Sequence, residues 1–296
     1  MPLVFAAIAP HGGIAIAEHC APDQRDLAQR TRAGLEELGR RFTAAAPDVT
    51  VVLTPHHVHI EGHMAVSVSA TLAGTLEGTH PVSLSVPVDR DLAIGLAGAM
   101  AAAGVPAVGV SAGANDPAAA TLWMDWATLI PLWFMGGRDD PPKPAVMIAP
   151  ARDLSWDHHV RAGRAITLAA ERSGRRVALI ASCDHGHAHD PAGPYGYAPE
   201  SKEFDDRVVD IVGRNALAEL LTFDAEWIAR AKPDSFWQML MLHGAIGDRW
   251  RGELLSYEAP TYFGMLCAAY RQVSCASSTT SAASTASART PASGSA

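Results

Sequence analysis

The alternation of short apolar runs with longer amphipathic segments is the feature that most constrains the fold of this chain. Short apolar runs are typical of buried strands, and segments with an apolar stripe are typical of helices that cover a sheet. Strand-like runs lie at residues 3–9, 49–54, 64–70, 105–111, 145–149 and 177–181, and helices are expected at residues 22–42, 91–103, 121–134, 157–172, 204–221 and 233–245. This order predicts an α/β fold, a single domain with a central mixed β-sheet flanked by helices.

One domain is expected to span residues 1–273, followed by a disordered tail at residues 274–296. Strand-like runs continue on both sides of the loop at residues 136–144, so this loop is not interpreted as a linker. The tail has 19 Ser, Thr or Ala among its 23 residues, no aromatic side chain and a single charge at Arg289. Such a composition offers too little apolar surface to offset the entropy lost when a chain is ordered.

The charge of the chain argues against nucleic acid and membranes as partners. It has 23 basic and 31 acidic residues, a formal net charge of −8, and no clustered basic face that could neutralise phosphates. No apolar stretch reaches the roughly 18 residues that a membrane-spanning helix needs. The first apolar run follows no basic segment and is interpreted as a strand rather than a signal peptide.

The cysteines indicate the compartment. Cys20, Cys183, Cys267 and Cys275 are scattered without CxxC spacing, so neither a zinc ribbon nor a disulfide framework is expected. A reducing, cytoplasmic location is therefore predicted.

The chain also has 13 histidines, and several of them directly follow strand-like runs. His11 follows the first run, His56 and His57 follow the second, and His185 and His187 follow the last. In open α/β sheets ligands bind beyond the carboxyl ends of the strands, so imidazoles from separate strand ends can meet at one point. Imidazole is the commonest metal ligand and titrates near neutral pH. The pattern therefore predicts a metal site, a proton shuttle, or both.

Not all of these imidazoles can face one site. Successive side chains of an extended chain point in opposite directions, so either His56 or His57 must face away. The spacing of His185, His187 and His189 suits a metal, but it also occurs in ordinary turns. His59 and His63 are interpreted as solvated loop residues, and no function is expected for His80, His158 and His159, which have polar neighbours in the sequence.

A carboxylate would complete a metal site of the two-histidine type, which leaves positions open for substrate and O2 on Fe(II). Glu258 lies in the apolar stretch Leu254–Pro260 with no adjacent basic residue. Burial of a carboxylate there costs several kcal/mol unless a cation or strong donors compensate, and a metal would do so. The alternative is a partly exposed glutamate at a helix N-terminus.

Five short elements occur in order along residues 3–272. They are His11 after the first strand, Pro55-His56-His57 after the second, Asp125-Trp126 followed by Pro131-Leu132, the segment from Ser182 to His187, and Tyr257-Glu258 at the start of a late helix. In this order and at these separations they resemble the class III extradiol ring-cleavage dioxygenases, the LigB-like superfamily. The resemblance implies a nonheme Fe(II), or Mn(II), held by His11, His57 and Glu258, with His56 in place of His57 if the second strand has another register.

The resemblance also implies an activity, namely ring cleavage of a catechol or 2-aminophenol with insertion of both atoms of O2. His187 matches the base that removes a substrate proton, with His185 and Tyr195 as further catalytic candidates. His189 and Tyr197 are expected in the substrate pocket, on or beside the loop of residues 190–197.

Trp126 is the main departure from the family pattern, because several members have a second active-site histidine there. An indole cannot relay protons, but it can donate a hydrogen bond or stack on an aromatic substrate. Either His187 performs the acid–base work with His185 or His189, or the substrate differs. The alternatives are a noncatalytic, Memo-like metal- or partner-binding relative and a zinc hydrolase with the same ligands. The partners expected are a small aromatic diol, O2 and other copies of this chain in a homo-oligomer.

Overall fold

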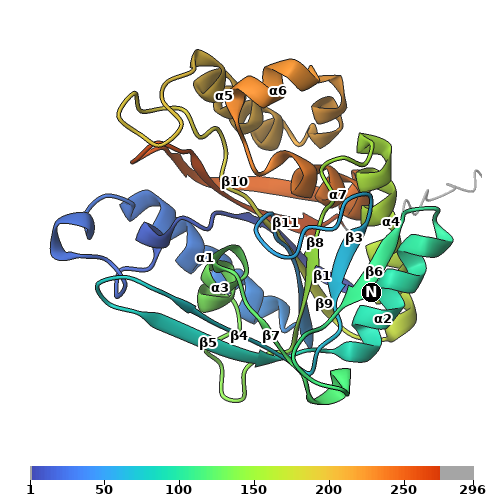
Figure 1. Ribbon diagram of the computed structural model, residues 1–296. Helices are drawn as coiled ribbons and strands as arrows, with labels where there is room; N and C mark the ends of the chain where they lie inside the picture. The colour runs from blue at the N-terminus through green and yellow to red at the C-terminus, as the bar shows by residue number, and fades with distance from the viewer. Residues whose placement is uncertain (1, 274–296) are drawn as a thin grey trace, which may run out of the picture.

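The computed structural model describes residues 2–273, and the predicted tail lies outside the described residues. Eight strands form the main sheet in the order β10-β11-β1-β9-β2-β8-β3-β6, and three strands form a second sheet in the order β5-β4-β7 (Figure 1). The main sheet consists of β1 (Leu3–Ala9), β2 (Val49–Leu53), β3 (Met64–Ser67), β6 (Ala107–Val110), β8 (Ala145–Ala149), β9 (Val177–Ser182), β10 (Trp250–Glu258) and β11 (Met265–Gln272). The second sheet consists of β4 (Thr71–Leu76), β5 (Val82–Pro87) and β7 (Thr121–Trp123).

The four central strands, β1, β9, β2 and β8, run parallel to one another. Every residue of β2, β8 and β9 is buried, as expected for parallel strands covered on both faces. The neighbouring strands β11 and β3 are antiparallel to β1 and β8, respectively, so the sheet is mixed. The predicted α/β fold with a central mixed sheet is therefore confirmed.

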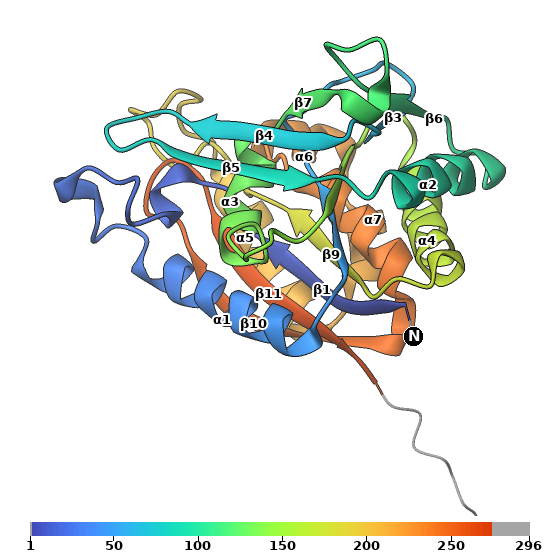
Figure 2. The same cartoon turned by 90° about the horizontal axis from the view of Figure 1, so that it is seen from below.

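Helices cover both faces of the main sheet. The α-helices are α1 (Gln29–Ala45), α2 (Arg90–Ala102), α3 (Trp126–Phe134), α4 (Trp156–Ser173), α5 (Pro199–Arg214), α6 (Ala225–Ala231) and α7 (Phe236–Ile246), with 3-10 turns at Gly13–Ala15, Pro22–Gln24, Pro117–Ala119, Leu217–Thr222 and Gly247–Arg249. Figure 2 shows α1, α3 and the second sheet on one face, and α2, α4 and α7 on the other. The helix α5 packs against α6 and β10. No helix within residues 2–273 is long and apolar enough to cross a membrane.

The segments at residues 121–134 and 257–258 differ from their predicted secondary structure. The segment predicted as one helix at residues 121–134 divides into β7 and α3, because the Asp125 side chain accepts a hydrogen bond from the Thr128 amide and starts the helix there. Tyr257 and Glu258 do not start a helix; they end β10, which pairs antiparallel with β11.

The helices α4 and α7 approach each other closely through two glycines. A Cβ atom on Gly163 would clash with the carbonyl oxygen of Met241, and one on Gly244 would clash with that of Val160. Backbone atoms cannot move aside as a flexible side chain can, so the helix contact requires glycine at both positions.

Replacement of Gly163 by alanine is therefore expected to lower the free energy of unfolding by about 1–3 kcal/mol, the usual cost of overpacking. Gly95, in the middle of α2, is the matched control, because a Cβ there meets no atom within 4 Å. Gly95→Ala is expected to raise stability by about 0.5–1 kcal/mol through its helix propensity. Urea unfolding of both variants checks this, and equal effects would contradict it.

Candidate metal centre

Functional side chains gather at one edge of the main sheet. Because β1, β2 and β9 are parallel, their carboxyl ends lie side by side, and the segments that follow them start at the same edge (Figure 1). His11 follows β1, the His56–His57 pair follows β2, and Asp184 follows β9. This edge is where ligands bind in open α/β sheets, and the sequence-based expectation for the location of the site agrees with this arrangement.

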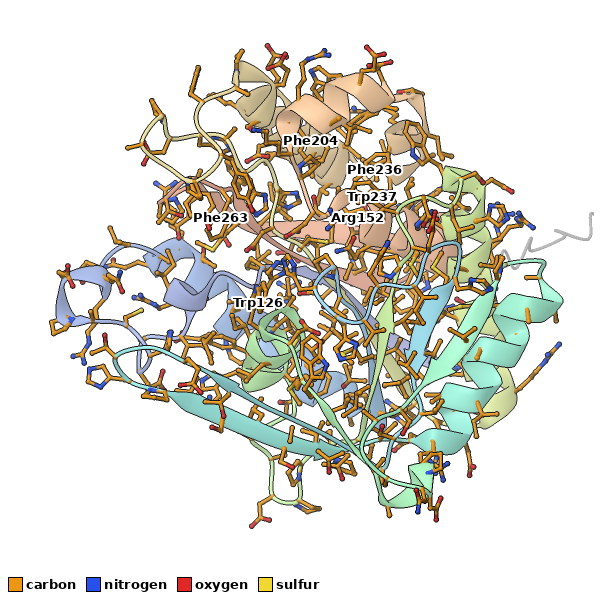
Figure 3. All side chains as sticks on the ribbon, in the orientation of Figure 1. Trp126, Arg152, Phe204, Phe236, Trp237 and Phe263 are labelled. Atoms are coloured by element: carbon orange, nitrogen blue, oxygen red, sulfur yellow. The ribbon has the colours of Figure 1, made fainter. Side chains whose placement is uncertain are left out.

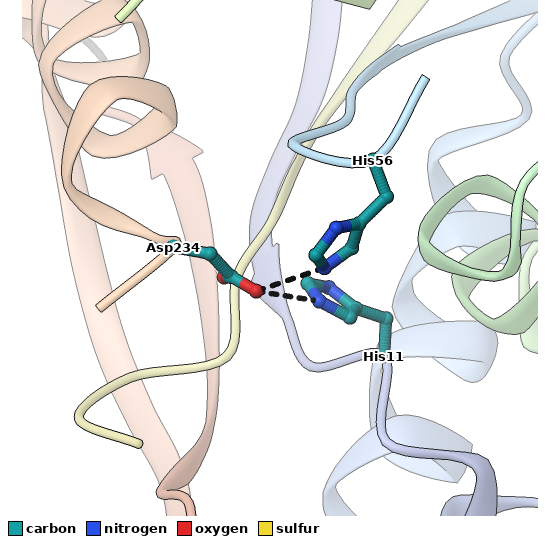
Figure 4. Close-up of side chains that lie close together, drawn as sticks. All are labelled: His11, His56 and Asp234. Carbon is teal, nitrogen blue, oxygen red and sulfur yellow. Dashed lines mark hydrogen bonds and ion pairs between the residues drawn. The ribbon is translucent and has the colours of Figure 1, made fainter. Parts of the chain in front are cut away.

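Three of the side chains at this edge form a compact cluster, drawn in Figure 4. The Asp234 Oδ2 atom lies 3.1 Å from His11 Nε2 and 3.0 Å from His56 Nε2. One ligand atom from each residue lies within 4.8 Å of the other two, so the three could hold one metal ion. Two atoms that bind a metal at about 2.1 Å and at a right angle are about 3.0 Å apart, so the observed spacing fits.

Asp234 comes from a distant part of the chain. It lies between α6 and α7, 223 residues from His11, and its Oδ1 atom accepts a hydrogen bond of 3.0 Å from the Asp184 amide. This bond fixes the carboxylate against the end of β9 and leaves Oδ2 directed at the imidazoles. Asp234 is 5% exposed, so its charge is held within the protein.

The hydrogen bonds of His11 determine which of its nitrogens faces the cluster. The Ser182 hydroxyl donates to the Ala127 carbonyl oxygen at 2.5 Å, so its single proton is already used. His11 Nδ1, 2.9 Å from the same hydroxyl oxygen, must therefore be the donor in that contact. With Nδ1 as the donor to Ser182, Nε2 is the nitrogen that faces Asp234, and loss of its proton to a bound metal would leave there the lone pair that a metal ligand needs.

Ser182→Ala is expected to weaken metal binding by about 10–100-fold, because the ring of His11 loses the partner that fixes its tautomer. Ser182→Thr is the matched control, since it keeps a hydroxyl at the same position. Competition with a chromogenic chelator measures both affinities, and an unchanged affinity in the alanine variant would contradict this assignment.

The electrostatics of the cluster favour a cation. Burial alone would lower the pKa of His11, but the facing Asp184 and Asp234 outweigh it and raise the pKa to about 9. Burial would raise the pKa of Asp234, yet His11 and His56 outweigh that effect and hold it well below its usual value. The pKa of Asp184 is raised to about 6, chiefly by burial. These carboxylates stabilise a positive charge on His11, and a divalent cation would be stabilised in the same way. Two imidazoles and a carboxylate are also suitable ligands for such a cation.

Two of the three predicted ligands are corrected by this geometry. His57 is turned away: its Nε2 atom lies 2.9 Å from the Trp123 carbonyl oxygen, and its ring stacks on the Trp123 indole with centroids 4.1 Å apart. Of the two alternatives, His56 is the one in the cluster. The two histidines lie in a bend after β2, where their rings point in different directions, and the stacking on Trp123 fixes the direction of His57.

Glu258 lies away from the cluster. It ends the edge strand β10, which is separated from β1 by β11, and its Oε1 atom accepts a hydrogen bond of 2.7 Å from the Thr31 amide in the first turn of α1. The free amides of a helix N-terminus are the strong donors that stabilise this carboxylate in an apolar setting. Glu258 is therefore not part of the cluster, contrary to the prediction, and the carboxylate found there is that of Asp234.

His187 lies beside the cluster, with its Nε2 atom 3.7 Å from Asp234 Oδ2. The Phe263 ring stacks on its imidazole with centroids 5.4 Å apart, and Tyr195 meets the same imidazole edge-on at 5.8 Å. The side chain of Tyr195 is itself 51% exposed. The structure thus brings His187 to the cluster and Tyr195 to His187.

The other residues predicted around His187 have different surroundings. His185 is fully buried and its Nδ1 atom contacts the Ser235 hydroxyl, so it faces the protein interior rather than the cluster. His189 Nε2 lies 2.9 Å from the buried carboxylate of Asp205, and Tyr197 is 62% exposed. These contacts give His185 and His189 structural partners.

Trp126 forms a wall of the site. Its indole stacks on the His56 ring, with centroids 4.4 Å apart and an interplanar angle of 26°, and it remains 45% exposed. Figure 3 labels it at the start of α3. The predicted placement of Trp126 beside the site is consistent with this contact.

Asp184 and Asp234 were not identified from sequence. Asp184 accepts a hydrogen bond from the His11 amide and lies next to His185 in the chain, so its place after a histidine-bearing strand was an available signal. Asp234 precedes an apolar helical segment, where aspartate usually caps a helix. That common role concealed its position at the cluster.

Two histidines and a carboxylate at the strand ends of an α/β sheet define a candidate metal-binding protein of the two-histidine, one-carboxylate class. Residues 5–266 match the family model of the catalytic LigB subunit of aromatic ring-opening dioxygenase, and the chain belongs to this family.

Two relatives support the comparison. A protein of Clostridium acetobutylicum is 23% identical over 252 residues, which are 84% of this chain and 53% of that protein, so this chain spans about half the length of the relative. The fold is similar to that of an uncharacterized protein of Escherichia coli K12, with a TM-score of 0.59 and 18% identity over 90% of this chain and 99% of the other.

Proposed function

We propose that this protein is a nonheme Fe(II)-dependent extradiol dioxygenase that cleaves the ring of a catechol-type or 2-aminophenol-type substrate with O2. The observation that carries the proposal is the cluster of His11, His56 and Asp234 with His187 beside it, in a member of the aromatic ring-opening family. These three residues would hold Fe(II), or Mn(II) in its place. When bound, the metal would bring substrate and O2 together and let electron density pass between them.

His187 is the group placed to move a proton. Its Nε2 atom faces the cluster, so it can take the proton of a substrate hydroxyl and return it later to an oxygen of the product. Phe263 and Tyr195 hold the ring in place by aromatic contacts on its face and edge. A rotation that would turn Nε2 away from the substrate is thereby disfavoured.

Trp126 is placed to orient an aromatic substrate. One face of its indole stacks on His56, a proposed metal ligand, and the indole is 45% exposed. A substrate ring can stack on the exposed part of the indole, and an offset aromatic pair contributes about 0.5–1.5 kcal/mol beyond its buried area. Because an indole cannot carry a proton, the acid–base work at this centre rests on His187.

The test is anaerobic loading of the protein with Fe(II), followed by addition of a panel of catechols and 2-aminophenols in air-saturated buffer. The expected result is a yellow ring-fission product that forms with uptake of one O2 per substrate. Absence of O2 uptake across the whole panel, in protein shown by metal analysis to contain Fe(II), would overturn the proposed function.

A further inference from the structure

The main chain around His187 is held by five consecutive amides. Each amide from residue 185 to residue 189 donates a hydrogen bond of 2.7–3.2 Å, and the acceptors in chain order are the Gly264 carbonyl oxygen, the Asp205 carboxylate, the Ala231 carbonyl oxygen, the Ser201 hydroxyl and the Tyr262 carbonyl oxygen. These acceptors belong to α5, to the end of α6 and to the connection between β10 and β11. Three separate parts of the fold therefore fix the segment of residues 185–189, which lies in no helix or strand.

The two amides on either side of His187 bond to side chains of α5. The Gly186 amide donates to Asp205 Oδ1 at 2.7 Å, and the Ala188 amide donates to the Ser201 hydroxyl oxygen at 2.9 Å. Both acceptor side chains are fully buried. A buried amide that loses its acceptor is left without water to replace it, so displacement of His187 from this position is costly.

Gly186 allows the segment to lie directly on the first turn of α5. A Cβ atom at this position would be 2.6 Å from the Ser201 carbonyl oxygen, which is backbone and cannot move aside. The close approach brings the Gly186 amide within reach of Asp205, one turn further along the helix.

The carboxylate of Asp205 joins several parts of this region. Its Oδ2 atom accepts a hydrogen bond of 2.7 Å from the Tyr257 hydroxyl and lies 2.9 Å from His189 Nε2. Together with the bond to Gly186, these contacts tie both ends of the segment to α5 and to the edge strand β10. Asp205 is outside the metal cluster and has no role in the function proposed above.

Ser201 connects the segment to the part of the chain that carries Asp234. Its hydroxyl donates to the Ala231 carbonyl oxygen at 2.8 Å, and the same oxygen accepts a hydrogen bond of 3.2 Å from the His187 amide. Ala231 ends α6, three residues before Asp234, and Figure 1 shows α5 and α6 side by side. The main chain of His187 and the segment that leads to the carboxylate ligand therefore share one acceptor.

We propose that Asp205, with Ser201, is a positioning residue for His187, which it holds at the cluster through the main-chain amides on either side of it. This proposal rests on the proposed function and adds to it two residues that lie outside the cluster. Proton transfer needs the imidazole within hydrogen-bond reach of the substrate. A displacement of about 1 Å can cost about 100-fold in rate, so the fixed main chain serves catalysis as well as the fold.

The first measurement compares steady-state O2 uptake by Fe(II)-loaded variants. Asp205→Ala is expected to lower kcat by about 10–100-fold and to change KM by less than about 3-fold, with its iron retained. Asp205→Asn is expected to lower kcat by no more than about 5-fold, because its amide oxygen can accept from Gly186 while its NH2 group faces the Tyr257 hydroxyl and the His189 imidazole, which can both accept. Metal analysis of each sample checks the iron.

The second measurement repeats Asp205→Ala in a His187→Ala background. No imidazole remains there to be positioned, so the residual rate is expected to change by less than about 3-fold. A merely structural role of Asp205 predicts the same fractional loss in both backgrounds. The comparison therefore separates positioning of His187 from general support of the fold.

The third measurement does not depend on activity. Hydrogen exchange of the Fe(II)-loaded protein, followed by mass spectrometry of peptides that cover residues 184–190, reports on the amides of the segment. Asp205→Ala is expected to exchange about 10–100-fold faster there than the unaltered protein, because the Gly186 amide has lost its acceptor. Asp205→Asn is expected to stay within about 3-fold of the unaltered protein.

Asp89 provides the matched control. Its Oδ1 atom accepts a hydrogen bond of 3.1 Å from the Leu92 amide at the start of α2, and its Oδ2 atom pairs with Arg175. Arg175 lies two residues before β9, at the edge of the sheet opposite the metal centre. Asp89→Ala is expected to destabilise the protein through the lost helix cap and to leave kcat and the exchange of residues 184–190 unchanged.

The remaining outcomes also decide the matter. An unchanged kcat in Asp205→Ala, loss of its iron, or equal fractional losses with and without His187 would overturn the role of Asp205 and leave the proposed function standing. If Asp205→Ala does not fold, Ser201→Ala takes its place, since it removes the acceptor of the Ala188 amide, and the same outcomes apply. If the unaltered protein with bound Fe(II) consumes no O2, the proposed function and this inference both fail.

Discussion

Replacement of Asp234 by alanine is expected to release the metal from this protein. Asp234 is the carboxylate of the cluster, and its Oδ2 atom contacts the Nε2 atoms of both His11 and His56. The variant keeps two neutral imidazoles and loses the charge that attracts a divalent cation. The loss of affinity should exceed the roughly 10–100-fold that follows removal of an outer partner of a metal ligand.

Glu258→Ala is the control for that experiment, since the sequence predicts Glu258 as a ligand and the structure places it at the N-terminus of α1. This variant should keep a full complement of metal and lose about 1 kcal/mol of stability with its contact to the Thr31 amide. Metal analysis after dialysis separates the two variants. Loss of iron from Glu258→Ala, with iron retained in Asp234→Ala, would restore the ligand set that the sequence predicts.

His187→Ala is expected to retain iron and lose ring cleavage by about 10²–10⁴-fold, the usual contribution of a general acid–base residue. The His187 imidazole lies beside the cluster without completing it, so its removal takes away the proton acceptor and leaves the ligands in place. Steady-state O2 uptake at saturating substrate measures the loss. Iron content measured on the same sample shows whether the metal remains.

His189→Gln is the control for His187, because it changes another histidine of the same loop. The His189 imidazole contacts the buried carboxylate of Asp205, and a glutamine amide can also donate to that carboxylate. Activity should therefore fall by less than about 10-fold. Equal losses in the two variants would show that the loop as a whole, and not the His187 imidazole, is what catalysis needs.

The strands of the centre were predictable because their signal is local. Runs of apolar residues at 3–9, 49–54 and 177–181 are strands with the predicted starts, and a histidine follows each of them within the next few residues. The prediction of a metal or proton-transfer site at one edge of the sheet needed only the rule that parallel strands end together. The hairpin of β4 and β5 was missed, although the alternating burial of β5 reflects a two-residue period in its sequence.

The ligand set was less predictable because it depends on contacts across the chain. The expectation that either His56 or His57 faces away holds, although the pair lies in a bend, and the indoles of Trp123 and Trp126 stack on one ring each. Glu258 has apolar neighbours because β10 packs against β11, α1 and α5. The charge of Glu258 is stabilised by the N-terminus of α1, through the Thr31 amide, and not by a metal. Neither contact has a signature in the neighbouring sequence.

The sequence by itself therefore determined the α/β fold and the edge of the sheet where chemistry would gather, since both follow from residue periodicity and from the order of strands. Only the tertiary structure decided that Asp234 joins His11 across 223 residues of chain, and that His56 rather than His57 turns toward them. The physical reason is that side-chain direction and long-range approach are set by packing, which sequence spacing does not encode.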